Sequence, residues 1–149
     1  MSYKAQENKV FHRGAYIGYC VMPDGRRFTT NGSIMVEGEI DTQPVKGQQD
    51  LRNQEMKPIT DAQLIKVIGS AENVEGGSEY DDATEILKSH SHTHAVDKEY
   101  SHYLQVKYPG LTWVLSEEVL VVVDNTGRFV AILAPKNIDK VKMKGDDSE

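Results

Sequence analysis

The strongest constraint on the fold is an uninterrupted apolar run near the C-terminus. Residues 119–123 read Val-Leu-Val-Val-Val, a pattern typical of a strand that is covered on both faces. The next residues, 124–127 (Asp-Asn-Thr-Gly), favour a turn, and residues 129–133 are again mostly apolar. We therefore predict a β-hairpin here. A further strand at 111–115 would complete a C-terminal three-stranded unit.

The N-terminal part shows a second pattern of short strands separated by turns. Pro23-Asp24-Gly25 is a turn sequence, because proline presets φ and glycine accepts a positive φ. Asn31-Gly32 lies between two β-prone segments, which is a strong hairpin signal. The sequence therefore predicts a three-stranded meander over residues 15–40.

The region between these two strand units favours helices. The apolar segment within 62–68 is too short for its periodicity to decide its type, and we favour a helix over 60–69 because Thr60 begins a capping box. A second helix is predicted over 78–88, because four apolar residues recur there at helical spacing: Tyr80, Ala83, Ile86 and Leu87. A third helix is expected to start near Thr93 and to end before Pro109-Gly110. The predicted class is α+β, a mostly antiparallel sheet with two or three helices packed on one face.

The chain of 149 residues has the length of one domain. We assign that domain to residues 10–138 and expect it to contain a long polar loop at 41–58. A flexible polar arm is expected at 1–9, and a loose charged tail at 139–149.

Charge and composition limit the classes of function. The net charge of -6, from 17 basic and 23 acidic residues, argues against a protein that coats nucleic acid. The single cysteine, Cys20, cannot form an internal disulfide, and a buried structural thiol is the favoured interpretation. We expect a soluble, cytoplasmic protein, because the polar start lacks a signal-peptide core and the apolar runs are too short to span a membrane.

The most distinctive local feature is a histidine cluster. His90, His92 and His94 alternate along the chain, and imidazole is a good ligand for zinc and other transition metals. Two histidines at i and i+2 of an extended segment lie roughly 6–7 Å apart on one face, so either neighbouring pair could share an ion. We treat these three residues as a candidate metal site. The alternative interpretations are an exposed linker and a pH-sensitive or catalytic role.

A family pattern overlaps this cluster in part. Residues 90–92 (His-Ser-His) and 101–104 (Ser-His-Tyr-Leu) resemble two pieces of the metal-binding motif of the JAB/MPN metalloproteases. Thr93 stands where that motif has proline, and Leu104 stands where it has an aspartate ligand. The chain is therefore not assigned to that family.

Three residues of the meander form a candidate site for nucleic acid or a nucleotide. Arg26 and Arg27 lie close to Tyr19 in the sequence, and exposed arginines with aromatic rings can bind single strands. The alternative interpretation is an aromatic side chain that faces the core beside solvated arginines.

These observations rank three functions. The first is a small non-catalytic binding protein, an inhibitor or accessory protein of the kind found in phages and mobile elements, which acts on an unidentified protein partner. The alternatives are a metal-dependent hydrolase built on the segment 90–94 and a module that binds nucleic acid or a nucleotide. We expect no catalytic residues and no cofactor, apart from the zinc that the hydrolase would need. A homo-oligomer is compatible with the apolar strand at 119–123, and no membrane contact is expected.

Overall fold

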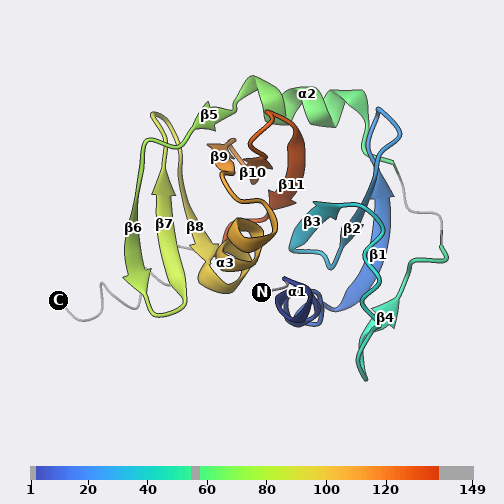
Figure 1. The fold of residues 1–149 in the computed structure, drawn as a ribbon. Coiled ribbons are helices and arrows are strands. Elements are labelled where there is room, and N and C mark those ends of the chain that lie inside the picture. Colours follow the sequence, from blue (N-terminus) through green and yellow to red (C-terminus); the bar gives the residue numbers. More distant parts are fainter. Residues whose placement is uncertain (1–2, 55–57, 138–149) are drawn as a thin grey trace.

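A computed structural model describes residues 3–54 and 58–137, shown as a ribbon in Figure 1. Within these residues the chain forms an α+β fold of three helices and eleven strands, which confirms the predicted class. The helices are α1 (Lys4–Phe11), α2 (Asp61–Gly69) and α3 (Lys98–Lys107). The strands are β1 (Tyr16–Val21), β2 (Arg27–Thr30), β3 (Ile34–Glu37), β4 (Gln49–Asp50), β5 (Glu72–Asn73), β6 (Gly76–Asp81), β7 (Thr84–Lys88), β8 (Thr93–Asp97), β9 (Thr112–Leu115), β10 (Leu120–Val123) and β11 (Phe129–Leu133).

The larger sheet joins the two predicted strand units. Its order is β4-β1-β2-β3-β11-β10-β9-β5, and every pair is antiparallel except the short parallel pair β1 and β4. The meander β1–β2–β3 and the C-terminal unit β9–β10–β11 are both confirmed. Strands β3 and β11 connect them, with Val36 opposite Ala131. The strands at its two edges, β4 and β5, have two residues each.

One face of this sheet packs against α1 and α3, and we call it the α1/α3 face. Its buried residues include Ile34, Val122 and Leu133, which share one core with Phe11 of α1 and Leu104 of α3. All of these side chains lie in the interior because strand residues alternate between faces and the helices present apolar stripes to them.

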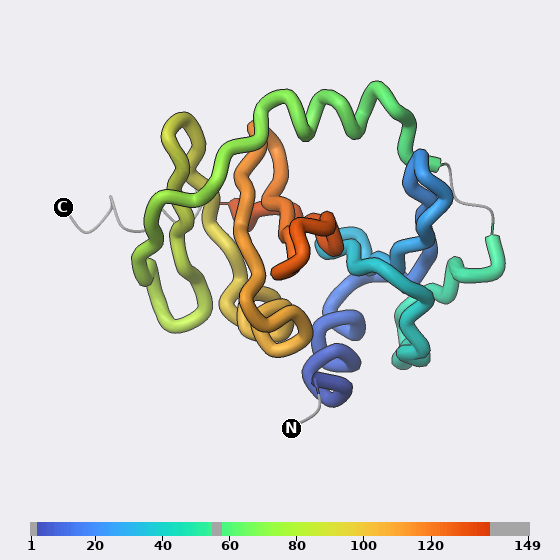
Figure 2. The backbone as a smooth tube through the Cα atoms, turned by 45° about the horizontal axis from the view of Figure 1, so that its top comes forward, coloured from blue at the N-terminus to red at the C-terminus, as the bar shows by residue number. Residues whose placement is uncertain are grey.

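The opposite face, which we call the α2 face, is crossed by α2 alone among the helices. Figure 2 shows α2 running over the sheet from the β1 side to the β9 side. The capping box predicted at Thr60 is present, because its hydroxyl accepts from the Gln63 N–H at 3.1 Å and its own N–H donates to the Gln63 side chain at 2.9 Å. The helices therefore lie on both faces of the sheet, whereas the sequence predicted helices on one face only.

The helix predicted over 78–88 is wrong. Strands β6 and β7 form a hairpin there, with a turn in which the Asp81 carboxylate accepts from the Ala83 N–H at 2.9 Å. The apolar spacing was misleading because the segment is short: Ile86 and Leu87 are buried at adjacent positions of β7, whereas all of β6, which includes Tyr80, is exposed. With β8 these strands make a separate three-stranded antiparallel sheet.

The third predicted helix begins later than expected. Thr93 starts strand β8, and α3 follows directly, with Asp97 as its N-cap. The Asp97 carboxylate accepts from the Glu99 N–H at 2.9 Å. Asp97, which was expected inside the helix, is therefore the residue that caps its N-terminus.

The predicted terminal and loop segments have mixed outcomes. Helix α1 replaces most of the arm expected at 1–9, because Val10 and Phe11 at its end are buried against the core. The loop expected at 41–58 contains the short strand β4, and its described part is held by Arg52, which donates to Asp50 and to the Thr42 carbonyl. The tail at 139–149 lies outside the described residues, and so do residues 55–57 of the loop.

A buried polar cluster joins α1 to α3. Glu7 is only 2% exposed, and its carboxylate accepts from the Tyr103 hydroxyl at 2.5 Å and from the Lys107 ammonium at 2.8 Å. Burial and the Glu7 charge raise the pKa of Tyr103 well above its usual range, so this hydroxyl remains a donor. The ammonium also lies 5.0 Å from the ring centre of Tyr3 and 5.8 Å from that of Tyr108.

Exchanging Glu7 for glutamine tests this cluster. The Glu7→Gln variant leaves the Lys107 ammonium without its buried counter-charge, so we expect the free energy of unfolding to fall by about 3 kcal/mol. Urea denaturation measures this change. The matched control is Lys4→Gln, which removes the exposed partner of the same carboxylate and should cost less than about 1 kcal/mol. Equal losses in the two variants would contradict the assigned role of the cluster.

A second link joins the end of α1 to the start of α3, and it predicts a pH dependence. Arg13 donates to both carboxylate oxygens of Asp97, at 2.9 and 2.7 Å. Burial raises the pKa of Asp97, but the bonds from Arg13 and the Glu99 N–H outweigh it and lower that pKa below its ordinary value. The pair therefore stabilises the fold above the ordinary pKa of aspartate and loses this effect as the pH falls through the lowered one.

The Asp97→Asn variant measures this contribution, because asparagine can still cap α3 but carries no charge. We expect it to unfold with roughly 1–2 kcal/mol less free energy than wild type near neutral pH. This difference should shrink as the pH falls below the ordinary pKa of aspartate and through the lowered pKa of Asp97. A difference of constant size across this range would show that the charge of Asp97 is not what stabilises the link.

Candidate functional site

The histidine segment forms the end of the β7–β8 hairpin. His90 lies exposed in the turn between the two strands, where the Ser89 N–H donates to the His92 carbonyl at 2.9 Å. His92 and His94 point to one side of β8, and their rings are parallel with centres 6.3 Å apart. The structure therefore brings together two of the three candidate metal ligands.

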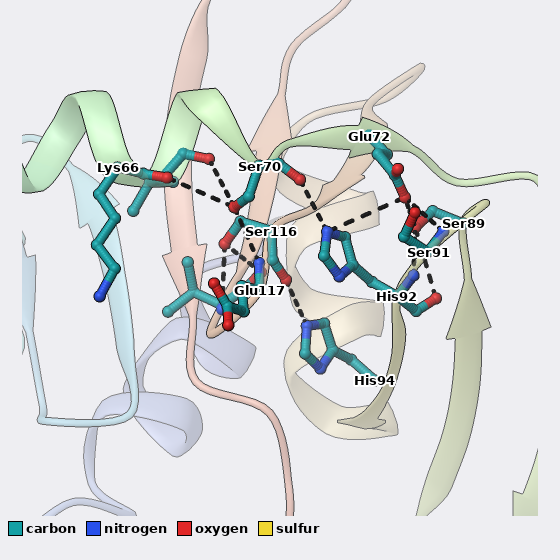
Figure 3. Close-up of polar contacts among 11 residues, drawn as sticks. Lys66, Ser70, Glu72, Ser89, Ser91, His92, His94, Ser116 and Glu117 are labelled. Carbon is teal, nitrogen blue, oxygen red and sulfur yellow. Dashed lines mark hydrogen bonds and ion pairs between the residues drawn. The ribbon is translucent and has the colours of Figure 1, made fainter.

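Each of these two rings is held by a backbone carbonyl from another part of the fold, as Figure 3 shows. The Nε2 atom of His92 lies 2.8 Å from the Ser70 carbonyl oxygen, and that of His94 lies 2.6 Å from the Ser116 carbonyl oxygen. A carbonyl can only accept, so each Nε2 carries the hydrogen and a neutral ring keeps its Nδ1 lone pair. The two histidines thus fasten the small sheet to the end of α2 and to the β9–β10 turn.

This tautomer is the one that suits a metal ligand, because ligating histidines usually donate their other ring N–H to a carbonyl or carboxylate. The ligand set itself is incomplete in the part of the chain that the structure describes. There, no three His, Cys, Asp or Glu side chains are grouped so that they could hold a metal ion. Leu104, at the position of the aspartate in the JAB/MPN pattern, is fully buried in the core.

Glu72 organises the same hairpin from β5. Its carboxylate accepts from the Ser89 hydroxyl and from the Ser91 N–H, both at 2.7 Å, and lies 4.0 Å from His92. These two hydrogen bonds lower the pKa of Glu72 to about 2, so it is ionised throughout the physiological range. The Glu72 carboxylate is thus engaged in the hydrogen bonds that hold the turn.

The predicted nucleic-acid site is not assembled as one cationic patch. Arg27 stacks over Tyr19 at 5.4 Å and pairs with Glu39 at 2.6 Å. Arg26, the next residue of the chain, pairs with Asp24 and Glu37, both at 2.8 Å. Each guanidinium therefore already faces a carboxylate, which reduces the positive potential that would attract phosphate.

Cys20 lies on the α2 face of β1 and is buried with Met22 and Phe28. Burial raises the pKa of its thiol to about 11, so the thiol remains protonated near neutral pH. A protonated, buried thiol suits the structural role expected for it.

The surface of α2 is a candidate site that the sequence motifs did not indicate. None of its nine residues is buried, although it contains Leu64, Ile65, Val67 and Ile68. Ile65 and Ile68 are 67% and 62% exposed, and we call the pair the outer α2 surface. The available signal was the four large apolar residues within five positions, because they form an apolar stripe wider than a single contact with a sheet covers.

An apolar cavity lies between α2 and the sheet. We call it the α2 cleft, with a volume of about 340 Å³. Leu64, Val67 and Ile68 line it from the helix, and Val114, Val121 and Val123 line it from strands β9 and β10. A second cavity of about 320 Å³ lies along the other flank of α2 and is more polar, because Ser70 and Ser116 line it. The two histidines hold the backbone of both serines, so the histidine cluster and the surroundings of α2 form one connected region.

Comparisons of the chain with protein families, with curated protein sequences and with solved structures found no match. Within residues 3–54 and 58–137, none of the helices is both long enough and apolar enough to cross a membrane.

Replacing His92 tests its structural role. We expect His92→Ala to lower the free energy of unfolding by about 1 kcal/mol, because the Ser70 carbonyl loses its donor. Amide hydrogen exchange should also quicken at the C-terminal end of α2. The matched control is His90→Ala, an exposed histidine of the same hairpin, which should change neither quantity. Equal effects of the two substitutions would contradict the proposed link.

Proposed function

We propose that this protein is a non-catalytic binding protein that contacts other proteins through the outer α2 surface. The observation that carries the proposal is the exposure of Ile65 and Ile68 on a helix that is anchored over the sheet. Exposed apolar side chains that cluster together mark interaction sites more often than isolated ones do. The role of inhibitor or accessory protein is part of this proposal, as is a cytoplasmic location, which suits the free thiol of Cys20.

The surroundings of this surface have the composition of an interface rim. Lys66 and Glu118 form an ion pair of 3.7 Å beside it, and their side chains are both largely exposed. An apolar centre with a polar border is the usual arrangement of protein–protein contacts. Charges at such a border contribute to the choice and orientation of the partner more than to the affinity.

The first partner to consider is a second copy of this chain. A twofold axis brings the same patch of two subunits together, so the patch must complement itself. The border of the outer α2 surface meets this requirement, because it carries one lysine and one glutamate that can exchange partners across the axis.

The Ile65→Asp variant tests the function. We expect it to lose association at least tenfold, because a carboxylate would be buried without a counter-charge in the contact. Sedimentation equilibrium measures self-association, and affinity capture followed by reconstitution with the purified partner measures binding to other proteins. The matched control is Val45→Asp, since Val45 is also an exposed apolar residue, at 43%, but lies in the 41–58 loop. The proposal is wrong if both variants associate as wild type does.

A charge exchange distinguishes a second copy from other partners. Lys66→Glu and Glu118→Lys should each weaken a homodimer, because like charges would then meet across the twofold axis. A mixture of the two variants should restore it, since opposite charges meet again in the mixed dimer. If the mixture associates as weakly as each variant alone, a second copy of this chain is excluded as the partner. Affinity capture then tests binding to other proteins.

The two alternative functions have less support. The metal-dependent hydrolase is supported by the tautomers of His92 and His94, but the described residues add no third ligand beside them. The module for nucleic acid is supported by the stacking of Arg27 on Tyr19, although both candidate arginines already face carboxylates.

A further inference from the structure

The floor of the α2 cleft is rigid and apolar. Val114, Val121 and Val123 line it from the sheet. Their branched Cβ atoms fix χ1, and neighbouring strands hold their backbones. Rotation of these valine side chains about χ1 is therefore restricted, which opposes their filling the cleft.

The roof of the cleft is held at both ends. Before α2, the Ile59 N–H donates to the Val21 carbonyl of β1 at 3.0 Å. After it, the Glu117 N–H donates to the Ser70 hydroxyl at 3.1 Å, and His92 holds the Ser70 carbonyl. Both ends of the helix are thus tied to other elements, which opposes its settling onto the sheet.

The charge at the edge of the cleft is already balanced. Arg26 is the charged residue that lines it. Its guanidinium is engaged with Asp24 and Glu37 and donates to the Phe129 carbonyl at 2.7 Å. An anionic ligand would have to displace these partners, whereas an uncharged one would leave them in place.

We propose that the α2 cleft is a binding site for a small, uncharged, largely hydrocarbon molecule. Its volume of about 340 Å³ lies at the lower end of the range of ligand pockets, roughly 300–1,000 Å³. Apolar cavities that cannot collapse take up apolar molecules of matching size. Such a ligand would contact Ile68 from below and so stiffen α2. Ile68 belongs both to this lining and to the outer α2 surface, whereas Ile65 belongs only to the outer surface, so substitutions at Ile65 and at the floor of the cleft test the two proposals separately.

The test uses N-phenyl-1-naphthylamine, an uncharged aromatic fluorophore, with the full-length protein. We expect saturable binding of one molecule per chain with enhanced fluorescence. The Val114→Phe variant, which fills the cleft from its floor, should weaken this binding at least tenfold. The matched control is Val45→Phe, the same substitution at an exposed position of the 41–58 loop, and it should bind as wild type does. Absence of saturable binding to wild type, or equal binding by Val114→Phe, would overturn the proposal.

A measurement on the wild-type protein covers the case in which Val114→Phe does not fold. Methyl NMR spectra recorded during the same titration should show the largest shifts for Val121, Val123 and Ile68. Val45 and the valines of the α1/α3 face, such as Val36 and Val122, should change little. Shifts centred on any other part of the molecule would place the fluorophore elsewhere and overturn the assignment.

Discussion

The contact between α1 and α3 is the interaction on which the rest of the fold depends. Helix α1 has eight residues, too few to be stable alone in water. It is held by the buried carboxylate of Glu7 near its middle and by the pair of Arg13 with Asp97 just beyond its C-terminal end. Because α3 continues directly from β8, the same links orient the small sheet, and through His92 and His94 they also position the end of α2 and the β9–β10 turn.

The parts of the fold that were predictable are those with local causes. The turns at Gly25 and Gly32 have positive φ values of 92° and 97°, as their sequences implied. The capping box at Thr60 also acts within four residues of chain. Helix α1 could not be predicted in this way, because Glu7 finds its partners Tyr103 and Lys107 about a hundred residues later in the chain. The hairpin β6–β7 was missed because a short segment fits both helical and strand periodicity.

The candidate site shows the same division. Chain order alone placed His92 and His94 on one face of an extended segment, and the structure agrees. What these rings do depends on two carbonyls, those of Ser70 and Ser116, that no spacing within 90–94 reveals. The apolar residues of α2 were visible in the sequence as a helix signal. Their exposure was not, because it results from how the two ends of the helix are tied to other elements.

The two-residue strands at the edges of the larger sheet have a consequence for assembly. A long free edge offers unpaired backbone groups on which another chain can add as a strand, and such edges lead to aggregation. Here the edges are the polar strands β4 and β5, and the exposed β6 of the small sheet carries Glu79 and Asp81. Strand addition is therefore discouraged at these edges, so the exposed apolar side chains of α2, rather than the backbone of the sheets, are the part of the described surface most open to contact with another chain.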